Sequence, residues 1–220
     1  MTLSGAFDSA VSGLSVASQQ IALVSRNIAN QGNSSASRKT ANVVSVNGLP
    51  MVASISRASS AALLGSLLAA NGNQAQQSAI SDALTQLQNT LGTGTNDKSS
   101  PAALIGALGN ALQTYAASPQ NTAAGEAAVA AAQDLANGLN NASATVQNVR
   151  EQADTAIGNS VSTINDLLSQ FAQANSAAVS ATIAGTDATG ALDQRDGILQ
   201  QLSSQIGITT VTRANNDVAI

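Results

Sequence analysis

The sequence predicts a mainly α-helical protein in which long, heptad-patterned helices form a coiled-coil-like bundle. Apolar residues recur in steps of three and four along most of the 220 residues, which is the spacing of a helix seam. Aromatic residues, whose large side chains fill much of a compact core, make up only 1% of the chain. Charged residues make up 9%. Two segments depart from helical spacing. They predict a small β-hairpin near 41–56 and the start of a β domain at the C-terminus.

The first element is a helix over residues 2–30 with an unbroken heptad pattern. Its apolar positions alternate steps of four and three and form a narrow seam of Leu3, Phe7, Ala10, Leu14, Ala17, Ile21, Val24 and Ile28. Ser, Gln and small residues cover the rest of its surface. Such a helix gains its stability from packing, so we expect it to need partner helices. An ordinary amphipathic helix packed within its own domain is the alternative interpretation.

A β-hairpin is predicted after a loop over residues 31–39. Residues 41–46 and 51–56 are rich in β-branched side chains and partly alternate in polarity. Asn47 and Gly48 lie between them, and this dipeptide is a strong signal for a hairpin turn.

Helical spacing resumes at about residue 58 and continues to about residue 91. Its apolar stripe consists of Leu63, Leu64, Leu67, Leu68, Ile80, Leu84, Leu87 and Leu91. The polar run 71–74 predicts a kink or one exposed side. Residues 92–97 are interpreted as a simple loop, because the Gly-Lys-Ser/Thr of a phosphate-binding loop is absent there.

Two Ser-Pro pairs predict helix starts. Ser100 and Pro101 fit an N-cap followed by proline in the first turn, and Ser118 and Pro119 repeat this signal. From the second pair a helical pattern runs to about residue 184, far beyond the length of a typical globular helix, which indicates a rod. Three glycines weaken this pattern and allow for one break: Gly125, Gly138 and Gly158.

The C-terminal part begins with a turn over residues 185–190. The helix that follows carries an apolar face of Leu192, Ile198, Leu199, Leu202 and Ile206. Residues 207–213 are predicted as a strand, 215–217 as a turn and 218–220 as the returning strand. Half a hairpin leaves unpaired backbone groups, so we expect the sequence to be part of a longer protein.

Three domains are predicted from these elements. Residues 1–57 form an N-terminal axial helix with a loop and hairpin, residues 58–206 form a helical rod domain, and residues 207–220 are the truncated start of an outer β domain.

Composition argues against several classes of function. The net charge of −4 disfavours binding to nucleic acid or to anionic membrane surfaces, which attract Lys/Arg patches. The chain has no His and no Cys, so Ser-His and Cys-His nucleophiles and the usual zinc sites are excluded. No run approaches the ~20 apolar residues of a membrane span, and no basic, apolar signal peptide opens the chain. We therefore expect no catalytic residue, cofactor or metal.

The densest charged cluster is Asp193-Gln194-Arg195-Asp196. Carboxylates three residues apart share a helix face and could act as an acid–base pair. We favour a structural interpretation, in which the carboxylates lie near a helix N-terminus and Arg195 forms local ion pairs, because no second catalytic group is evident.

Two motifs resemble those of the bacterial flagellar axial proteins, the family of rod, hook and hook-associated proteins. The first is Ser25-Arg26-Asn27-Ile28-Ala29-Asn30, which closes the N-terminal heptad helix. In the family a Gly-aromatic-Ser/Thr-Arg stretch follows, and here Ser37 and Arg38 match its last two positions. The second motif is Leu192-Asp193-Gln194-Arg195-Asp196 after the long helix, and it is similar to that of hook-associated proteins at the hook–filament junction.

The resemblance implies a secreted structural subunit of the extracellular bacterial flagellum, not an enzyme. Such proteins leave the cell unfolded through the flagellar type III export apparatus. They assemble beyond the hook as a ring of identical subunits that contacts the hook and the second junction protein. In the family the N-terminal helix pairs with a C-terminal helix to form the inner tube. The alternatives are another axial protein (flagellin, the hook protein or the second junction protein) or a cytoplasmic coiled-coil adaptor.

Overall fold

A computed structural model describes residues 3–92 and 98–220, and its fold is mainly α-helical, which confirms the predicted class. The described residues form five α-helices and two short β-hairpins. Their contacts group into two units, residues 1–75 with 162–220 and residues 76–161. The three-part division into 1–57, 58–206 and 207–220 stays a prediction.

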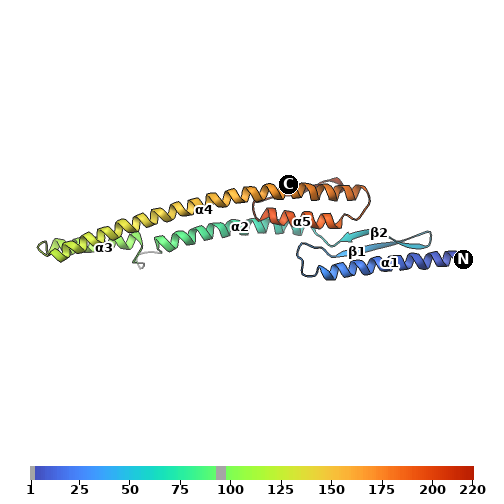
Figure 1. Ribbon diagram of the computed structural model, residues 1–220, viewed down its shortest axis with the longest axis horizontal. Helices are drawn as coiled ribbons and strands as arrows, with labels where there is room; N and C mark the ends of the chain where they lie inside the picture. Colours follow the sequence, from blue (N-terminus) through green and yellow to red (C-terminus); the bar gives the residue numbers. More distant parts are fainter. Residues whose placement is uncertain (1–2, 93–97) are drawn as a thin grey trace. The chain divides into compact units, whose positions relative to one another are not determined.

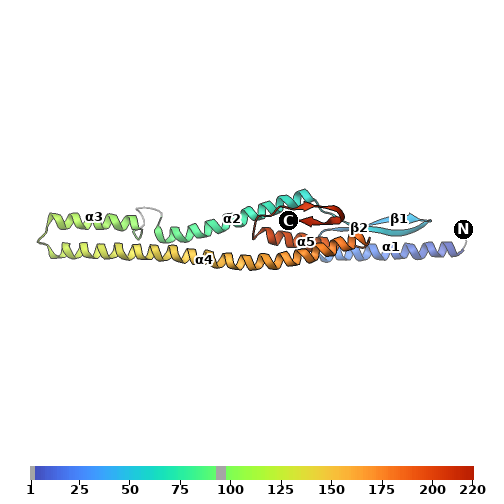
Figure 2. The ribbon, with the colours of Figure 1, turned by 90° about the horizontal axis from the view of Figure 1, so that it is seen from above.

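In the first unit, helix α1 (Leu3–Ala29) lies beside a hairpin of β1 (Lys39–Val46) and β2 (Leu49–Arg57), as Figures 1 and 2 show. The predicted turn is confirmed, because Asn47 and Gly48 both adopt positive φ angles, 54° and 82°. The strands are antiparallel, with a register shift after the pairing of Asn42 with Ser54.

The core of this unit is formed by α2 (Ala61–Leu91), α4 (Thr122–Ile183) and α5 (Thr189–Ser203). Helix α5 doubles back beside the end of α4 in both ribbon views (Figures 1 and 2). The buried core side chains are apolar and come from these helices and from the last strand: Leu68, Leu167, Phe171, Ala174, Ile198, Leu199, Leu202 and Val218.

The polar run 71–74 does not end α2, which continues through it. Asn71 and Gly72 are half-buried because α5 packs there. A Cβ atom at Gly72 would lie 3.3 Å from the carbonyl oxygen of Ser203. The Asn71 amide also donates to the Ser203 hydroxyl at 3.4 Å. Asn71 and Gly72 therefore form a contact between two helices, whereas Asn73 and Gln74 are exposed, in line with the predicted exposed side.

In the second unit, α3 (Pro101–Ala117) packs on α4, which is unbroken over 62 residues. Two of the glycines that weaken the helical pattern are contact points. The Leu104 side chain occupies the position where a Cβ of Gly138 would lie, and the Tyr115 ring lies 3.3 Å from the corresponding position of Gly125.

The two predicted helix starts have different outcomes. Ser100 caps α3 as predicted, because its hydroxyl accepts a hydrogen bond from the Ala103 N–H at 3.2 Å. The prediction at Ser118 is wrong, since this residue is the C-cap of α3. Helix α4 begins at Thr122, where the Asn121 side chain accepts from the Ala124 N–H at 3.3 Å. Proline follows helix ends as readily as it opens helices, so the pair alone is ambiguous.

The C-terminal hairpin consists of β3 (Val211–Thr212) and β4 (Val218–Ala219), joined through a 3₁₀ turn, η1 (Ala214–Asn216). The strand predicted over 207–213 is therefore shorter, because only two residues find a partner. Ile206 lies beyond the end of α5 and is half-exposed, so it does not belong to the apolar face of that helix. The predicted loop at 92–97 falls mostly on 93–97, outside the described residues.

Candidate functional site

The predicted seam of α1 is exposed along its whole length. Its six large apolar side chains are between 54% and 89% exposed, and Ala10 and Ala17 are exposed as well. The large members are Leu3, Phe7, Leu14, Ile21, Val24 and Ile28. This row forms a continuous apolar face, which we call the α1 seam.

A different face of α1 packs on the chain's own hairpin. The helix contacts both β1 and β2, and its buried residues are Val16 and Leu23, 8% and 3% exposed. These two residues are one heptad apart and fall outside the seam. The sequence interpretation missed this face, although the pair Val16 and Leu23 at heptad spacing was a usable signal. Helix α1 therefore has one covered side and one open side.

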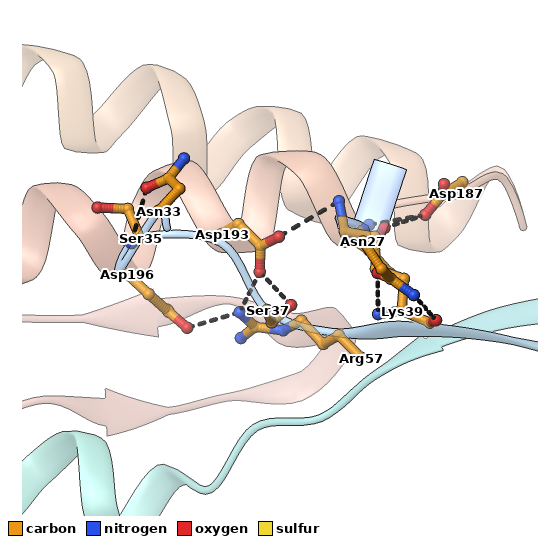
Figure 3. A network of polar contacts seen from close by, with 10 residues as sticks. Asn27, Asn33, Ser35, Ser37, Lys39, Arg57, Asp187, Asp193 and Asp196 are labelled. Atoms are coloured by element: carbon orange, nitrogen blue, oxygen red, sulfur yellow. Dashed lines mark hydrogen bonds and ion pairs between the residues drawn. The ribbon is translucent and has the colours of Figure 1, made fainter. Parts of the chain in front are cut away.

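The end of α1 is fastened to β1 by the motif residue Asn27. Its side-chain amide donates to the Lys39 carbonyl oxygen, and its side-chain oxygen accepts from the Lys39 N–H, both at 2.9 Å. This paired hydrogen bond sets where the hairpin begins. It also places the Lys39 side chain for its contact with α5 (Figure 3).

Asp193 on α5 is the centre of a polar junction with the hairpin, shown in Figure 3. Its carboxylate lies 3.2 Å from the Lys39 ammonium and 3.1 Å from the Arg57 guanidinium. The Ser37 hydroxyl donates to the same carboxylate at 2.5 Å. The side chains of Lys39, Arg57 and Asp193 are 11–17% exposed, so these charges meet largely away from water.

Asp196 completes this cluster from the same helix. Its carboxylate lies 2.7 Å from the Arg57 guanidinium, while the Arg195 Nε is farther away at 3.7 Å. The expectation that both carboxylates lie at a helix N-terminus is wrong, because α5 starts at Thr189 and has no acidic residue in its first turn. Their close partners are instead cations 136 or more residues away in the sequence. We call Lys39, Arg57, Asp193 and Asp196 the charge cluster.

Arg195 points to the C-terminal hairpin. Its guanidinium donates to the Asn175 side-chain oxygen at 3.2 Å and to the Asn216 carbonyl oxygen. Asn175 in turn accepts from the Val218 N–H at 3.1 Å and donates to Asp217 at 2.6 Å. Arg195 is 5% exposed, and this network joins α4, α5 and the hairpin.

Two of these groups have shifted pKa values. Burial raises the pKa of Asp193, but the hydrogen bonds from Ser37, Arg57 and Lys39 outweigh it, so the pKa lies below its usual value of 3.8. Burial lowers the pKa of the Arg195 guanidinium, and the charge of Asp196 opposes this shift. Arg195 still carries its charge at neutral pH, because guanidinium groups titrate far above that range. The lowered pKa of Asp193 favours its charged form, which suits ion pairing.

The structure brings together only part of the predicted motif residues. Asn27, Asp193 and Asp196 take part in the polar junction, and Leu192 is buried. Arg195 binds the C-terminal hairpin instead, and the remaining motif residues are exposed: Ile28, Ala29, Asn30, Arg38 and Gln194. Sequence reasoning missed Lys39, Arg57 and Asn175, whose roles depend on distant partners and left no local signal.

Two further observations concern the described residues. Their helices include none with the length and hydropathy needed to cross a bilayer. Nor do they contain a group of three or more His, Cys, Asp or Glu side chains gathered as for a metal ion.

A family model described as the flagellar hook-associated protein FlgK helical domain matches residues 84–220, more than half of the chain. The chain belongs to this family. The match extends over α3, α4, α5 and the C-terminal hairpin, and it contains the second motif, from Leu192 to Asp196.

Relatives of the chain support this membership. It is 25% identical over 218 residues to flagellar hook-associated protein 1 of Escherichia coli strain K12. It is 26% identical over 221 residues to flagellar hook-associated protein 1 of Salmonella typhimurium strain LT2. Each alignment covers 94% of this chain and 39% of the relative, so the chain spans about two fifths of the curated relatives it matches.

Proposed function

We propose that this chain is a structural subunit of the bacterial flagellum at the hook–filament junction, and that it assembles with copies of itself through the α1 seam. The observation that carries the proposal is the open row of six large apolar side chains on α1, while the helix packs on its own hairpin through Val16 and Leu23. A contiguous row of exposed large apolar side chains favours association with another protein. The role is structural, and it uses no catalytic group.

The family membership supports the place of action. The relatives are named flagellar hook-associated protein 1, and the family model carries the hook-associated name as well. In this proposal the subunits form a ring outside the cell, between the hook and the second junction protein, after passage through the flagellar export apparatus. Flagellin and the hook protein are less favoured, because the matched model is the hook-associated helical domain.

The test is complementation with seam variants. The complete reading frame that contains this chain is expressed in cells that lack flagellar hook-associated protein 1, and filaments on the hooks are counted. We expect Leu14→Asp and Ile21→Asp to abolish filaments, because a charge buried between helices is costly. Ala22→Asp, at an exposed position outside the seam, is the matched control and keeps them.

Two outcomes would contradict the proposal. Normal filaments with both seam variants would show that the seam is not an assembly face. Failure of the unchanged protein in this strain, with rescue in cells lacking another axial protein, would move the assignment to that protein. Secretion of each variant into the medium is measured in parallel, so that an export defect is separated from an assembly defect.

A further inference from the structure

The N-terminal segment, residues 3–57, lies outside the hydrophobic core of its unit. All of the buried core side chains come from residues 68–218, in α2, α4, α5 and β4. The two buried apolar residues of α1 are Val16 and Leu23, and α1 makes its main contacts with β1 and β2. The segment is therefore a small packed body of its own, and apolar burial does little to hold it on α5.

Polar contacts gather where this segment meets α5. Lys39 and Arg57 supply two positive charges, and Asp193 and Asp196 supply two negative charges, at distances between 2.7 and 3.2 Å. Ser37 donates to the Asp193 carboxylate at the same place. Nearby, the loop approaches so closely that a Cβ of Gly197 would lie 3.4 Å from the Ser35 side chain.

The cluster is incompletely satisfied. The Asp196 Oδ1 and the Arg195 Nε are buried without a hydrogen-bond partner, and they face each other at 3.7 Å. Desolvation of this carboxylate is therefore only partly offset in the docked state. Opening the cluster returns the Asp196 carboxylate to water, so release costs less than the number of ion pairs suggests.

We propose that the charge cluster is a latch that positions the N-terminal segment on α5 and releases it while the helical core stays folded. Asp193 and Asp196 are positioning residues, and Arg57 is the central cation because it bridges both carboxylates. The segment that carries the α1 seam can then turn relative to the core during assembly. The proposal rests on the charge cluster alone and stands whether or not the seam is an assembly face.

The experiment measures docking directly. The chain contains no cysteine, so Ser18→Cys on α1 and Gln201→Cys on α5 introduce two unique, exposed labelling sites. Spin labels at these sites report their distance by double electron–electron resonance. A Leu14→Asp background keeps the protein monomeric if the seam self-associates. The variants are Arg57→Met and Arg57→Lys. Arg57→Met removes the cation that bridges the two carboxylates, whereas Arg57→Lys keeps the positive charge but not the guanidinium.

We expect a single narrow distance distribution in the parent protein. Arg57→Met raises the undocked fraction at least about tenfold, as expected when buried carboxylates lose their cation. Arg57→Lys gives an intermediate value, and 1 M NaCl shifts the parent in the same direction. Arg26→Met removes an exposed cation of the same segment and leaves the distances unchanged.

Hydrogen exchange of the α5 amides separates a latch from a structural defect. In the latch model these amides stay protected in Arg57→Met while the label distances broaden. Unchanged distances in Arg57→Met would overturn the proposal. Loss of α5 protection together with the broadening would overturn it too, because the segment would then belong to the cooperative core.

Discussion

Helices α1 and α5 differ in burial, and the difference is the opposite of what their compositions suggest. The 27-residue α1 carries a heptad row of large apolar side chains, yet only Val16 and Leu23 are buried. The 15-residue α5 contains the charged run Asp193 to Asp196, yet nine of its residues are buried, among them Asp193 and Arg195. The apolar helix is the exposed one, and the charged helix is the enclosed one.

The difference shows that an apolar pattern indicates what a helix can contact, not what it contacts within its own chain. The α1 seam has no partner in the described residues because the helix packs on its hairpin through another face. The charges of α5 are tolerated inside because each finds an opposite charge or a hydrogen-bond acceptor nearby.

The largest effect is expected in the apolar core around α5. Leu202 is 1% exposed, and Leu202→Ala should lower the free energy of unfolding by about 3 kcal/mol, from lost burial and the cavity left behind. Urea titration followed by circular dichroism, with hydrogen exchange of α5, measures the change. A loss below about 1 kcal/mol would show that α5 is not enclosed as described.

A buried charge of α5 should come next. Arg195→Met leaves the Asn175 side-chain oxygen and the Asn216 carbonyl without their cation, and the cost should be about 2 kcal/mol. Hydrogen exchange of the Val218 amide, which donates to Asn175, reports the loss. Arg213→Met is the control, since that side chain is 63% exposed and should contribute less than about 0.5 kcal/mol. Equal effects of the two variants would refute the contrast between buried and exposed charge.

Acid should weaken docking of the N-terminal segment on α5. The pKa of Asp193 is depressed in the docked state, so its contribution is fully present above its usual value of 3.8 and is lost as the pH falls through the depressed value. The charged groups that face this carboxylate are Lys39 and Arg57, and Asp196 shares Arg57. The spin-label distances should be constant between pH 7 and 5 and broaden below about pH 4. Asp193→Asn should be partly undocked at pH 7 already, with a weaker pH dependence.

The smallest effect on folding is expected in the α1 seam. Leu14 is 70% exposed, so Leu14→Ala should change the free energy of unfolding of the monomer by less than about 0.5 kcal/mol. The same substitution should reduce filament assembly, because the lost apolar area matters only when a partner covers it. A loss of 2 kcal/mol or more in the monomer would mean that the seam packs within the chain.

Local signals in the sequence determined most of the elements. Hairpin geometry follows from Asn47 and Gly48, and the start of α3 follows from the Ser100 hydroxyl, because such preferences act within a few residues. Periodic apolar residues determined that the chain is mainly helical. The two motifs were sufficient to indicate the flagellar family to which the chain belongs.

Only the tertiary structure decided what these elements contact. Nothing near Asp193 in the sequence shows that its carboxylate pairs with Lys39 and Arg57, which are more than 130 residues away. The residues around Asp193 would be compatible with any other Lys or Arg as its partner. Likewise, the choice between the two apolar faces of α1 depended on where the hairpin folds back. Local conformation is a property of neighbouring residues, whereas pairing across long separations is set by the packing of the whole unit.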